Sequence, residues 1–254
     1  MSRGYSDAQE NGFLENVKVV VQALLIALVV RTFLFQPFNI PSGSLIPTLL
    51  IGDYLFVSKY AYGYSRHSFP FSIVPFEGRV WASEPKRGDI AVFKLPRDNS
   101  TDYIKRVIGL PGDRIKFTNG ILLINEVPAR KERLQSVPVS AGAGFRDRAT
   151  SFRETLPNGV SYVIQEFETF GNKLGRNTDV YVVPPGHYFM VGDNRDNSID
   201  SRDMSSQGVG YVPLENFVGR AEVIFFSVEE GYSPLQVWHW PSAVRWDRIF
   251  STVR

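Results

Sequence analysis

An apolar segment near the N-terminus constrains this chain more than any other feature of its sequence. Residues Val19–Phe35 read VVVQALLIALVVRTFLF, and only Gln22 and Arg31 interrupt the run strongly. As a helix rising about 1.5 Å per residue, the segment would be about 25 Å long, close to the ~30 Å hydrocarbon layer of a bilayer. Arg31 lies in the last turns, from which its side chain can reach the polar interface. We predict a membrane anchor over residues 17–36, ended by Pro37, whose ring and missing N–H disfavour a helix.

A cleaved signal peptide and a buried core helix are the alternatives for this segment. A signal peptide needs a basic n-region and a cleavage site with small residues. Here Arg3 is the one basic residue in positions 1–16, against three acidic residues, and no A-x-A follows the apolar run. Hydrophobicity on all sides argues against an amphipathic surface helix but leaves a buried core helix open. We favour the anchor, with residues 1–16 as a short cytoplasmic N-terminus and the folded mass after the span.

Composition excludes several classes of partner and site. The 254 residues suffice for one sizeable domain or two small ones. A net charge of +2 without a basic tract gives no reason to expect a nucleic acid partner. Cysteine is absent, which excludes disulfides, thiol nucleophiles and Cys-based zinc sites. The three histidines, His67, His187 and His239, form no metal-binding pair, so we expect neither a metal nor another cofactor.

Beyond residue 50 the sequence is strand-like, which predicts an all-β body over residues 37–254. Short runs rich in β-branched or aromatic residues alternate with Gly, Pro, Asn and Asp. The predicted strands are 54–57, 89–93, 103–108, 115–117, 121–124, 161–168, 180–183, 187–191 and 221–226. Between two of these runs, Asn119-Gly120 predicts a tight hairpin turn, because this dipeptide accepts positive φ values.

Two segments depart from the strand pattern. Lys131–Arg153 is polar and rich in Ser, Ala, Gly and Arg, which predicts a mobile excursion on a smaller β-region rather than part of the core. The tail Pro234–Arg254 contains Trp238, Trp240 and Trp246 among basic residues. The tail could pack on the body or lie at a lipid interface, where tryptophan is favoured, and the sequence does not decide between the two.

Ser44 lies in a turn that suits a nucleophile, within PSGSLIPTLL just beyond the apolar run. A serine hydroxyl is a weak nucleophile until a base removes its proton. Pro41 and Pro47 stiffen the chain on both sides, and Gly43 allows close approach of the backbone. Such a turn could aim the Ser44 hydroxyl and N–H at one point, where the Ser42 hydroxyl would complete an oxyanion hole. The alternative is a Ser/Gly/Pro linker that leaves the membrane.

A lysine in an apolar strand could supply the base that such a serine needs. Lys105 lies beside Ile104 and Val107, and a Gly-Leu-Pro-Gly-Asp turn follows. The ordinary pKa of lysine, ~10.4, is too high for a base at neutral pH, but burial disfavours the charged form and lowers the pKa. The alternative is an ordinary strand lysine that faces water.

A third segment, Gly192–Arg202, is dense in side chains that form hydrogen bonds. Its sequence, GDNRDNSIDSR, follows an apolar strand and is suited to holding a site in place. Asp200 and Arg202 can pair, and Ser198 could orient a lysine amine. The Asx-rich composition also suggests calcium, but the spacing of an EF-hand loop is not met.

Together these segments resemble the bacterial type I signal peptidases, also called leader peptidases. The resemblance covers most of the chain and rests on five motifs in the order of that family. They are PSGSLIPTLLIGDYLFVSKYAYG (41–63), RGDIAVFKLP (87–96), DYIKRVIGLPGD (102–113), GDNRDNSIDSR (192–202) and VGRAEVIFFS (218–227).

The resemblance implies a role for individual residues. Ser44 would be the nucleophile and Lys105 the general base, with the Ser42 hydroxyl and the Ser44 N–H as oxyanion donors. Three supporting residues would be Ser198, which orients the lysine, and the pair Asp200 and Arg202. Residues matching those that line the family's shallow pockets are Phe38, Ile40 and Ile104, which implies small residues such as Ala at substrate positions −1 and −3. Leu45 stands where the family commonly has methionine, a near-isosteric change that should alter pocket shape modestly.

The resemblance also implies a mostly antiparallel β fold, with a catalytic body and a variable second β-region at about residues 114–186. A single span implies a cytoplasmic N-terminus and a catalytic domain on the outer, periplasmic side of the bacterial inner membrane. The expected partners are preprotein signal peptides and the lipid bilayer, with proximity to the secretion translocon as a further expectation.

The sequence thus predicts a membrane-anchored serine endopeptidase that removes signal peptides from exported preproteins with a Ser/Lys dyad. One alternative is a dedicated maturation peptidase of the same Ser/Lys class. Another is a membrane-tethered β domain that binds peptides without cleaving them.

Overall fold

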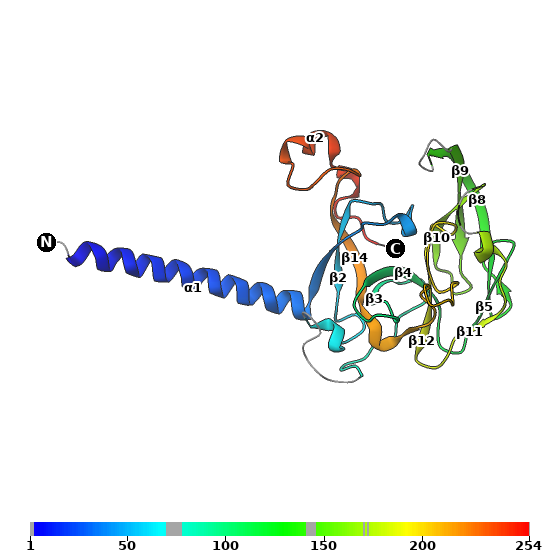
Figure 1. Ribbon diagram of the computed structural model, residues 1–254, viewed down its shortest axis with the longest axis horizontal. Helices are drawn as coiled ribbons and strands as arrows, with labels where there is room; N and C mark the ends of the chain where they lie inside the picture. Colours follow the sequence, from blue (N-terminus) through cyan, green and yellow to red (C-terminus); the bar gives the residue numbers. More distant parts are fainter. Residues whose placement is uncertain (1–2, 70–77, 141–145, 170, 172, 254) are drawn as a thin grey trace.

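A long exposed helix and a β body make up the computed structural model, which describes residues 3–69, 78–140, 146–169, 171 and 173–253 (Figure 1). Helix α1, Arg3–Phe33, projects away from the body. Its stretch Glu15–Phe33 is long and apolar enough to cross a membrane, and only 6% of that stretch is buried. The core helix of a soluble protein would be mostly buried, so the core-helix alternative is wrong.

The chain passes from α1 into the first strand without a linker. Strand β1, Phe35–Asn39, forms one edge of the main sheet and pairs with β2, Asp53–Ser58. The helix therefore ends at Phe33, earlier than predicted, and Pro37 lies inside β1 rather than ending the helix. An edge strand tolerates proline because its outward side needs no N–H donor for the sheet.

The body is built on a seven-stranded antiparallel sheet with the order β1-β2-β14-β3-β4-β12-β13. Its other strands are β3 (Ile90–Lys94), β4 (Asp102–Gly109), β12 (His187–Val191), β13 (Val212–Pro213) and β14 (Phe217–Ser227). The strand pattern of the sequence predicts all the strands of this sheet except β1 and β13. The expectation of a mostly antiparallel β fold after an N-terminal apolar helix is confirmed.

Two smaller antiparallel sheets lie beside the main one (Figure 1). The first, in the order β11-β5-β6-β7, consists of β5 (Arg114–Thr118), β6 (Ile121–Ile124), β7 (Val127–Pro128) and β11 (Tyr181–Val182). The second, in the order β10-β9-β8, consists of β8 (Arg130–Ser140), β9 (Arg146–Thr155) and β10 (Ser161–Phe167). The predicted hairpin turn joins β5 to β6, with φ values of 51° at Asn119 and 76° at Gly120.

Where the structure describes it, outside residues 141–145, Lys131–Arg153 is not the predicted mobile excursion but forms paired strands of a smaller sheet. It contributes no buried residue to the core clusters of the described chain, as predicted. The segment forms most of β8 and β9, which pair from Arg130↔Thr155 to Ser140↔Arg146. Its polar sequence hides the strands because some of their buried side chains are polar, among them Thr150 and Ser151. The pattern continues on β9 just beyond the segment. Glu154 is 0% exposed and pairs with the buried Arg195.

The second β-region shares its core with the main sheet. Phe117 and Ile164 of the smaller sheets belong to the same buried cluster as Ile108 of β4 and Phe189 of β12. The β strands within residues 114–182 are therefore an outgrowth packed on the main sheet rather than a domain with a core of its own.

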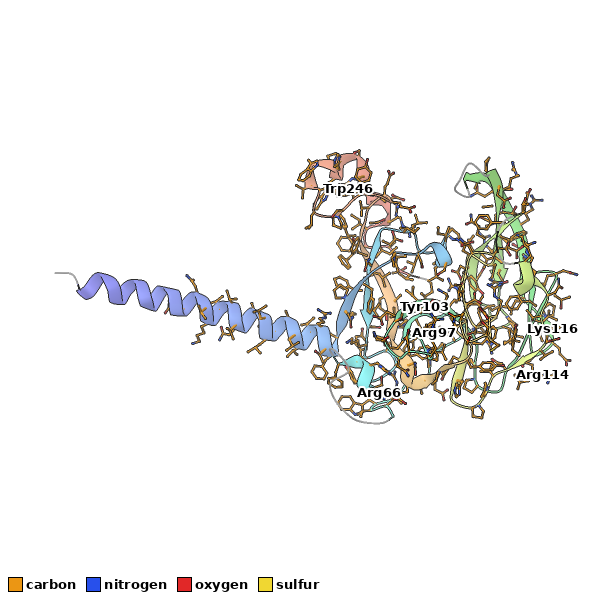
Figure 2. The ribbon with its side chains drawn as sticks, viewed as in Figure 1. Arg66, Arg97, Tyr103, Arg114, Lys116 and Trp246 are labelled. Carbon is orange, nitrogen blue, oxygen red and sulfur yellow. The ribbon has the colours of Figure 1, made fainter. Side chains whose placement is uncertain are left out.

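The C-terminal tail wraps back onto the main sheet. Its short helices are η6 (Val237–His239), α2 (Trp240–Ala243) and η7 (Trp246–Arg248). Arg248 contacts the buried carboxylate of Asp53 at 3.0 Å, and Trp240 packs on an aromatic ring of β14. Trp238 and Trp246 are 70% and 58% exposed. Figure 2 shows Trp246 on the side of the body from which α1 projects.

Candidate active site

Ser44 lies in a single turn of 3-10 helix, Gly43–Leu45 (η1), that follows β1. Two apolar side chains hold this turn down. Leu45 and Leu49 are 1% and 0% exposed and belong to a core cluster with Leu55 of β2. A flexible linker would not bury two leucines, so the linker alternative for this segment is wrong. The Ser44 side chain itself is largely buried.

Lys105 reaches Ser44 from β4. Its Nζ donates hydrogen bonds of 2.7 Å to Ser44 Oγ and 3.0 Å to the Ile104 carbonyl oxygen. The lysine is 4% exposed, so the alternative of a strand lysine facing water is wrong. Burial lowers the pKa of Lys105 to about 8, because the charged form loses its hydration, although the carboxylates of Asp200 and Asp193 favour the charge. Lys105 therefore lies within hydrogen-bond reach of the Ser44 hydroxyl, and its pKa is close to the neutral pH at which a general base must be unprotonated.

The next residue of β4 anchors the strand on its opposite face. Because side chains alternate along a strand, Arg106 points away from Ser44. Its guanidinium forms two hydrogen bonds, of 2.8 and 2.7 Å, with the carboxylate of Asp193, and both residues are almost fully buried. A pair of this kind is costly to break, because either charge alone would be left uncompensated. Sequence reasoning misses this pair, although Arg106 directly follows Lys105 and Asp193 lies in the GDNRDNSIDSR motif.

Ser42 lies at the N-cap of the turn, with its Oγ 3.4 Å from Ser44 Oγ. The first backbone N–H groups of a helical turn have no acceptor within the turn, and the Ser44 N–H is one of these. The Ser42 hydroxyl and the Ser44 N–H are therefore two hydrogen-bond donors close to the Ser44 oxygen.

The loop after β12 contributes a buried ion pair. Arg202 makes the predicted pair with Asp200, at 2.9 Å from Nε to Oδ1 and 2.8 Å from Nη2 to Oδ2. Burial disfavours the charged form of Asp200, but Arg202 and the Gly192 N–H outweigh it and hold the pKa of Asp200 below its usual range. A stable negative charge thus lies near Lys105.

A cavity of about 1030 Å³ opens beside Ser44 and Lys105. Its lining includes most of the predicted site: Phe38, Ile40, Ser42, Ile104, Ser198, Asp200 and Arg202. Tyr103, labelled in Figure 2, lines it from β4. Within the described part of the chain, no three His, Cys, Asp or Glu side chains gather so as to hold a metal ion.

Known proteins are similar to this sequence over most of its length. The family described as "Signal peptidase, peptidase S26" matches residues 13–226. Signal peptidase I of Rickettsia typhi (strain Wilmington) is 40% identical over 245 residues, which cover 91% of this chain and 90% of that protein. Signal peptidase I of Rickettsia conorii (strain Malish 7) is 40% identical over 242 residues, with 89% and 88% covered. The chain belongs to the signal peptidase family.

Membership in this family makes the protein a peptidase and confirms the resemblance found in the five sequence motifs. A crystal structure of a signal peptidase I from Enterococcus faecalis V583 matches 54% of this chain and 97% of its own, with 28% identity and a TM-score of 0.31.

Two of the predicted site residues of this signal peptidase family member lie differently from expectation. Ser198 does not donate a hydrogen bond to Lys105. Its buried hydroxyl forms no hydrogen bond with any residue that the structure describes. The hydroxyl lies close enough to Asp200 to favour the negative charge of that carboxylate. Leu45 is absent from the cavity lining, because its side chain points into the core. Leu45 therefore holds the Ser44 turn in the core and does not line the cavity.

One wall of the cavity was not predicted from the sequence. Residues 175–181, which lead from β10 into β11, contribute five lining residues: Gly175, Asn177, Thr178, Asp179 and Tyr181. Their sequence carries no motif, and they reach the site because the small sheets pack on the main one. Gly175 gives a local hint of the crowding here, since a Cβ on it would come within 2.8 Å of Arg202 Nη1.

Proposed function

We propose that this signal peptidase family member is a membrane-anchored serine endopeptidase that removes N-terminal signal peptides from exported preproteins with a Ser44/Lys105 dyad. The observation that carries the proposal is the 2.7 Å contact between Lys105 Nζ and Ser44 Oγ in a site where burial lowers the lysine pKa to about 8. A general base needs both hydrogen-bond reach and a neutral fraction at working pH, and these two properties support Lys105.

Acylation begins when neutral Lys105 takes the Ser44 proton and the Ser44 oxygen attacks the scissile carbonyl carbon. The carbonyl π electrons move to its oxygen, which becomes an oxyanion between the Ser42 hydroxyl and the Ser44 N–H. The tetrahedral intermediate then collapses: the C–N bond breaks, and the leaving amine takes its proton from the Lys105 ammonium. The signal peptide remains as an ester on Ser44.

Deacylation repeats these transfers with water as the nucleophile. Lys105, neutral again, takes a proton from water while the water oxygen attacks the ester carbon. Collapse of the second tetrahedral intermediate breaks the ester bond, and the Lys105 ammonium returns the proton to the Ser44 oxygen. The cleaved signal peptide leaves with a new carboxylate, and the dyad is restored.

Two strand segments beside the cavity have room for an extended substrate. Strand β1 pairs only with β2, so its other edge is open. Strand β12 pairs with β4 only from Arg106 onward, so the edge of β4 before Arg106 is also open. Residues 38–40 and 102–105, on these open edges, line the cavity. Main-chain hydrogen bonds to such edges supply affinity whatever the side chains of the substrate.

Specificity would come from the apolar lining between these edges. Phe38 and Ile104 are half-buried, Ile40 is buried, and all three pack in or against one core cluster. Pockets closed by such packing leave room for small side chains only, which supports a preference for Ala-like residues at positions −1 and −3.

Anchoring by α1 places the body on one side of a bilayer. The β body follows the apolar stretch that begins at Glu15. We assign the N-terminus to the cytoplasm and the body to the periplasmic face of the inner membrane, near the translocon, where signal peptides meet both the lipid and the peptidase.

Cysteine labelling tests this topology cleanly, because the chain has no cysteine of its own. A Ser205→Cys variant, altered at an exposed position of the body, is expected to react with a membrane-impermeant maleimide in spheroplasts. The matched Ser6→Cys variant should react only after the membrane is permeabilised. Labelling of Ser6→Cys alone in unbroken spheroplasts would place the body in the cytoplasm and contradict the assignment.

The function itself is tested with purified full-length protein and a preprotein bearing an A-x-A site. We expect one cut after the second alanine, located by N-terminal sequencing of the product, and loss of cleavage when the −1 alanine is replaced by leucine. Since the base must be neutral, kcat/KM should rise with pH through about 8. Binding without cleavage would favour the non-catalytic peptide-binding domain, and cleavage restricted to one dedicated class of precursor would favour a maturation peptidase.

A further inference from the structure

Asn194 holds the nucleophile turn on both sides of Ser44. Its side-chain Nδ2 donates a 2.9 Å hydrogen bond to the Gly43 carbonyl oxygen, and its backbone N–H donates one of 3.1 Å to the Ser44 carbonyl oxygen. The residue is 1% exposed and does not line the cavity. Asn194 thus acts on the backbone of the turn and not on anything bound in the cavity.

The bond to Gly43 bears directly on the Ser44 N–H. The Gly43 carbonyl and the Ser44 N–H belong to one peptide group, which is planar and trans, so the two bonds point in opposite directions. Fixing the carbonyl oxygen from one side therefore fixes the direction of the N–H on the other. A hydrogen bond accepted by the carbonyl also polarises the peptide group and strengthens its N–H as a donor.

Asn194 is itself held rigidly. Its neighbours on either side bridge to β10: the Asp193 carbonyl accepts from the Gln165 N–H, and the Arg195 N–H donates to the Gln165 carbonyl, both at 2.9 Å. The same neighbours are the buried partners of Arg106 and Glu154. Two buried ion pairs and a strand bridge therefore fix the position from which Asn194 reaches the turn.

The Asn194 amide leaves one of its two polar atoms without a partner in the part of the chain that the structure describes. Its Oδ1 is buried without a hydrogen-bond partner in the described residues, whereas Nδ2 is committed to Gly43. A buried unpaired carbonyl oxygen costs stability and calls for a reason. We propose that Asn194 is a positioning residue that aims the Ser44 N–H at the developing oxyanion; the inference rests on the proposed peptidase mechanism.

The expected signature of this role is a loss of kcat without a comparable change in KM. Complete loss of an oxyanion donor lowers kcat by about 10²–10³-fold, so a misdirected donor should lower it by about 10–100-fold. The pH profile should keep its midpoint, because Lys105 is untouched. A substrate-like complex carries no oxyanion, so the binding of the corresponding peptide with a C-terminal alanine amide, whose carbonyl is neutral, should change little.

The experiment compares Asn194→Ala and the isosteric Asn194→Asp with Asn158→Ala in full-length protein. Asn158 is a matched control, because its Nδ2 also donates to a backbone carbonyl, that of Arg87 at 3.1 Å, at an exposed turn. Thermal unfolding of each variant establishes that it is folded. If Asn194→Ala does not fold, Asn194→Asp keeps the side-chain shape, and its acceptor oxygen facing Gly43 should lower kcat at least as much.

A peptide aldehyde ending in alanine separates a positioning role from a merely structural one. Ser44 Oγ adds to the aldehyde carbon, its proton passes to Lys105, and the new oxyanion lies at the two donors. We expect the Asn194 variants to lose aldehyde affinity by about the factor they lose in kcat, as Ser42→Ala should, while the same peptide with a C-terminal amide binds within about threefold of wild type.

Equal losses of affinity for the aldehyde and for the peptide amide, or a folded variant with kcat within threefold of wild type, would overturn the role of Asn194. A wild-type protein that cleaves no A-x-A preprotein would instead overturn the proposed function, so the two failures are distinguishable.

Discussion

Replacing Ser44 with alanine is expected to lower turnover of an A-x-A preprotein by about 10⁴-fold or more, since the change removes the attacking oxygen and the remaining donors cannot replace it. The fold should persist, because the variant loses one small hydroxyl and its 2.7 Å hydrogen bond with Lys105. That loss is worth about 1 kcal/mol. Cleavage is measured by gel shift of the preprotein, and folding by thermal unfolding of the same preparation.

A serine outside the site serves as the control for Ser44→Ala. Ser205 is exposed and absent from the cavity lining, so Ser205→Ala should cleave at the wild-type rate. If Ser44→Ala retained turnover within tenfold of wild type, the nucleophile would have to be another group. Ser42, whose Oγ lies 3.4 Å away, would then be the first to test.

Replacing Lys105 with methionine should give an inactive protein that is more stable than wild type at pH 6. Methionine keeps the apolar stem and removes the buried charge. The folded-state pKa of Lys105 is about 8, against an ordinary value of 10.5. At about 1.36 kcal/mol per pH unit, holding the charge in the fold costs roughly 3 kcal/mol. Loss of the hydrogen bonds to Ser44 and Ile104 offsets part of this gain, so we expect about 1–3 kcal/mol.

The advantage of Lys105→Met should depend on pH in a defined way. Below about pH 8 the lysine is protonated in both states, so wild type carries the whole penalty. Between pH 8 and 10.5 the folded state has lost the proton and the unfolded state keeps it, so wild-type stability rises with pH. The difference between variant and wild type should therefore shrink over this range. Urea unfolding in detergent at pH 6 and pH 10 measures it.

Lys116→Met is the matched control for this experiment. Lys116 lies on β5 with its side chain exposed, so its replacement removes no burial penalty and should change stability by less than about 0.5 kcal/mol at both pH values (Figure 2). A Lys105→Met protein that is inactive but no more stable than wild type at pH 6 would mean that burial does not disfavour the charge. The general-base role would then lose its physical support.

Much of the fold follows from local sequence. Runs such as 121–124 and 187–191 coincide with β6 and β12, because alternating burial selects β-branched and aromatic residues. The prediction failed where local chemistry misleads. Pro37 is predicted to end the helix, but the helix ends earlier, at Phe33, and the proline lies in the edge strand β1. The polar stretch of β8 and β9 is predicted to be a mobile excursion, because buried polar side chains carry no periodic apolar signal.

Part of the site could likewise be predicted from the sequence, and part could not. The turn residues around Ser44 and the apolar neighbours of Lys105 are visible in the sequence, and the structure brings the two side chains together. The hydrogen bond expected from Ser198 to Lys105 is absent among the described residues, and Leu45 faces the core. Both errors concern the direction of a side chain, which depends on neighbours that the local sequence does not specify.

By itself, the sequence determined which groups can do chemistry in this protein and what kind of elements carry them. Residue type and short-range spacing suffice for that: an apolar helix-length run, alternating strands, a constrained serine and a lysine among apolar neighbours. Only the tertiary structure decided that Lys105 is buried enough for its pKa to fall to about 8, and that Asn194 reaches Gly43 across 151 positions of sequence. Dehydration of a charge and the aim of a backbone N–H depend on segments far apart in the chain, because those segments exclude the water and supply the partners.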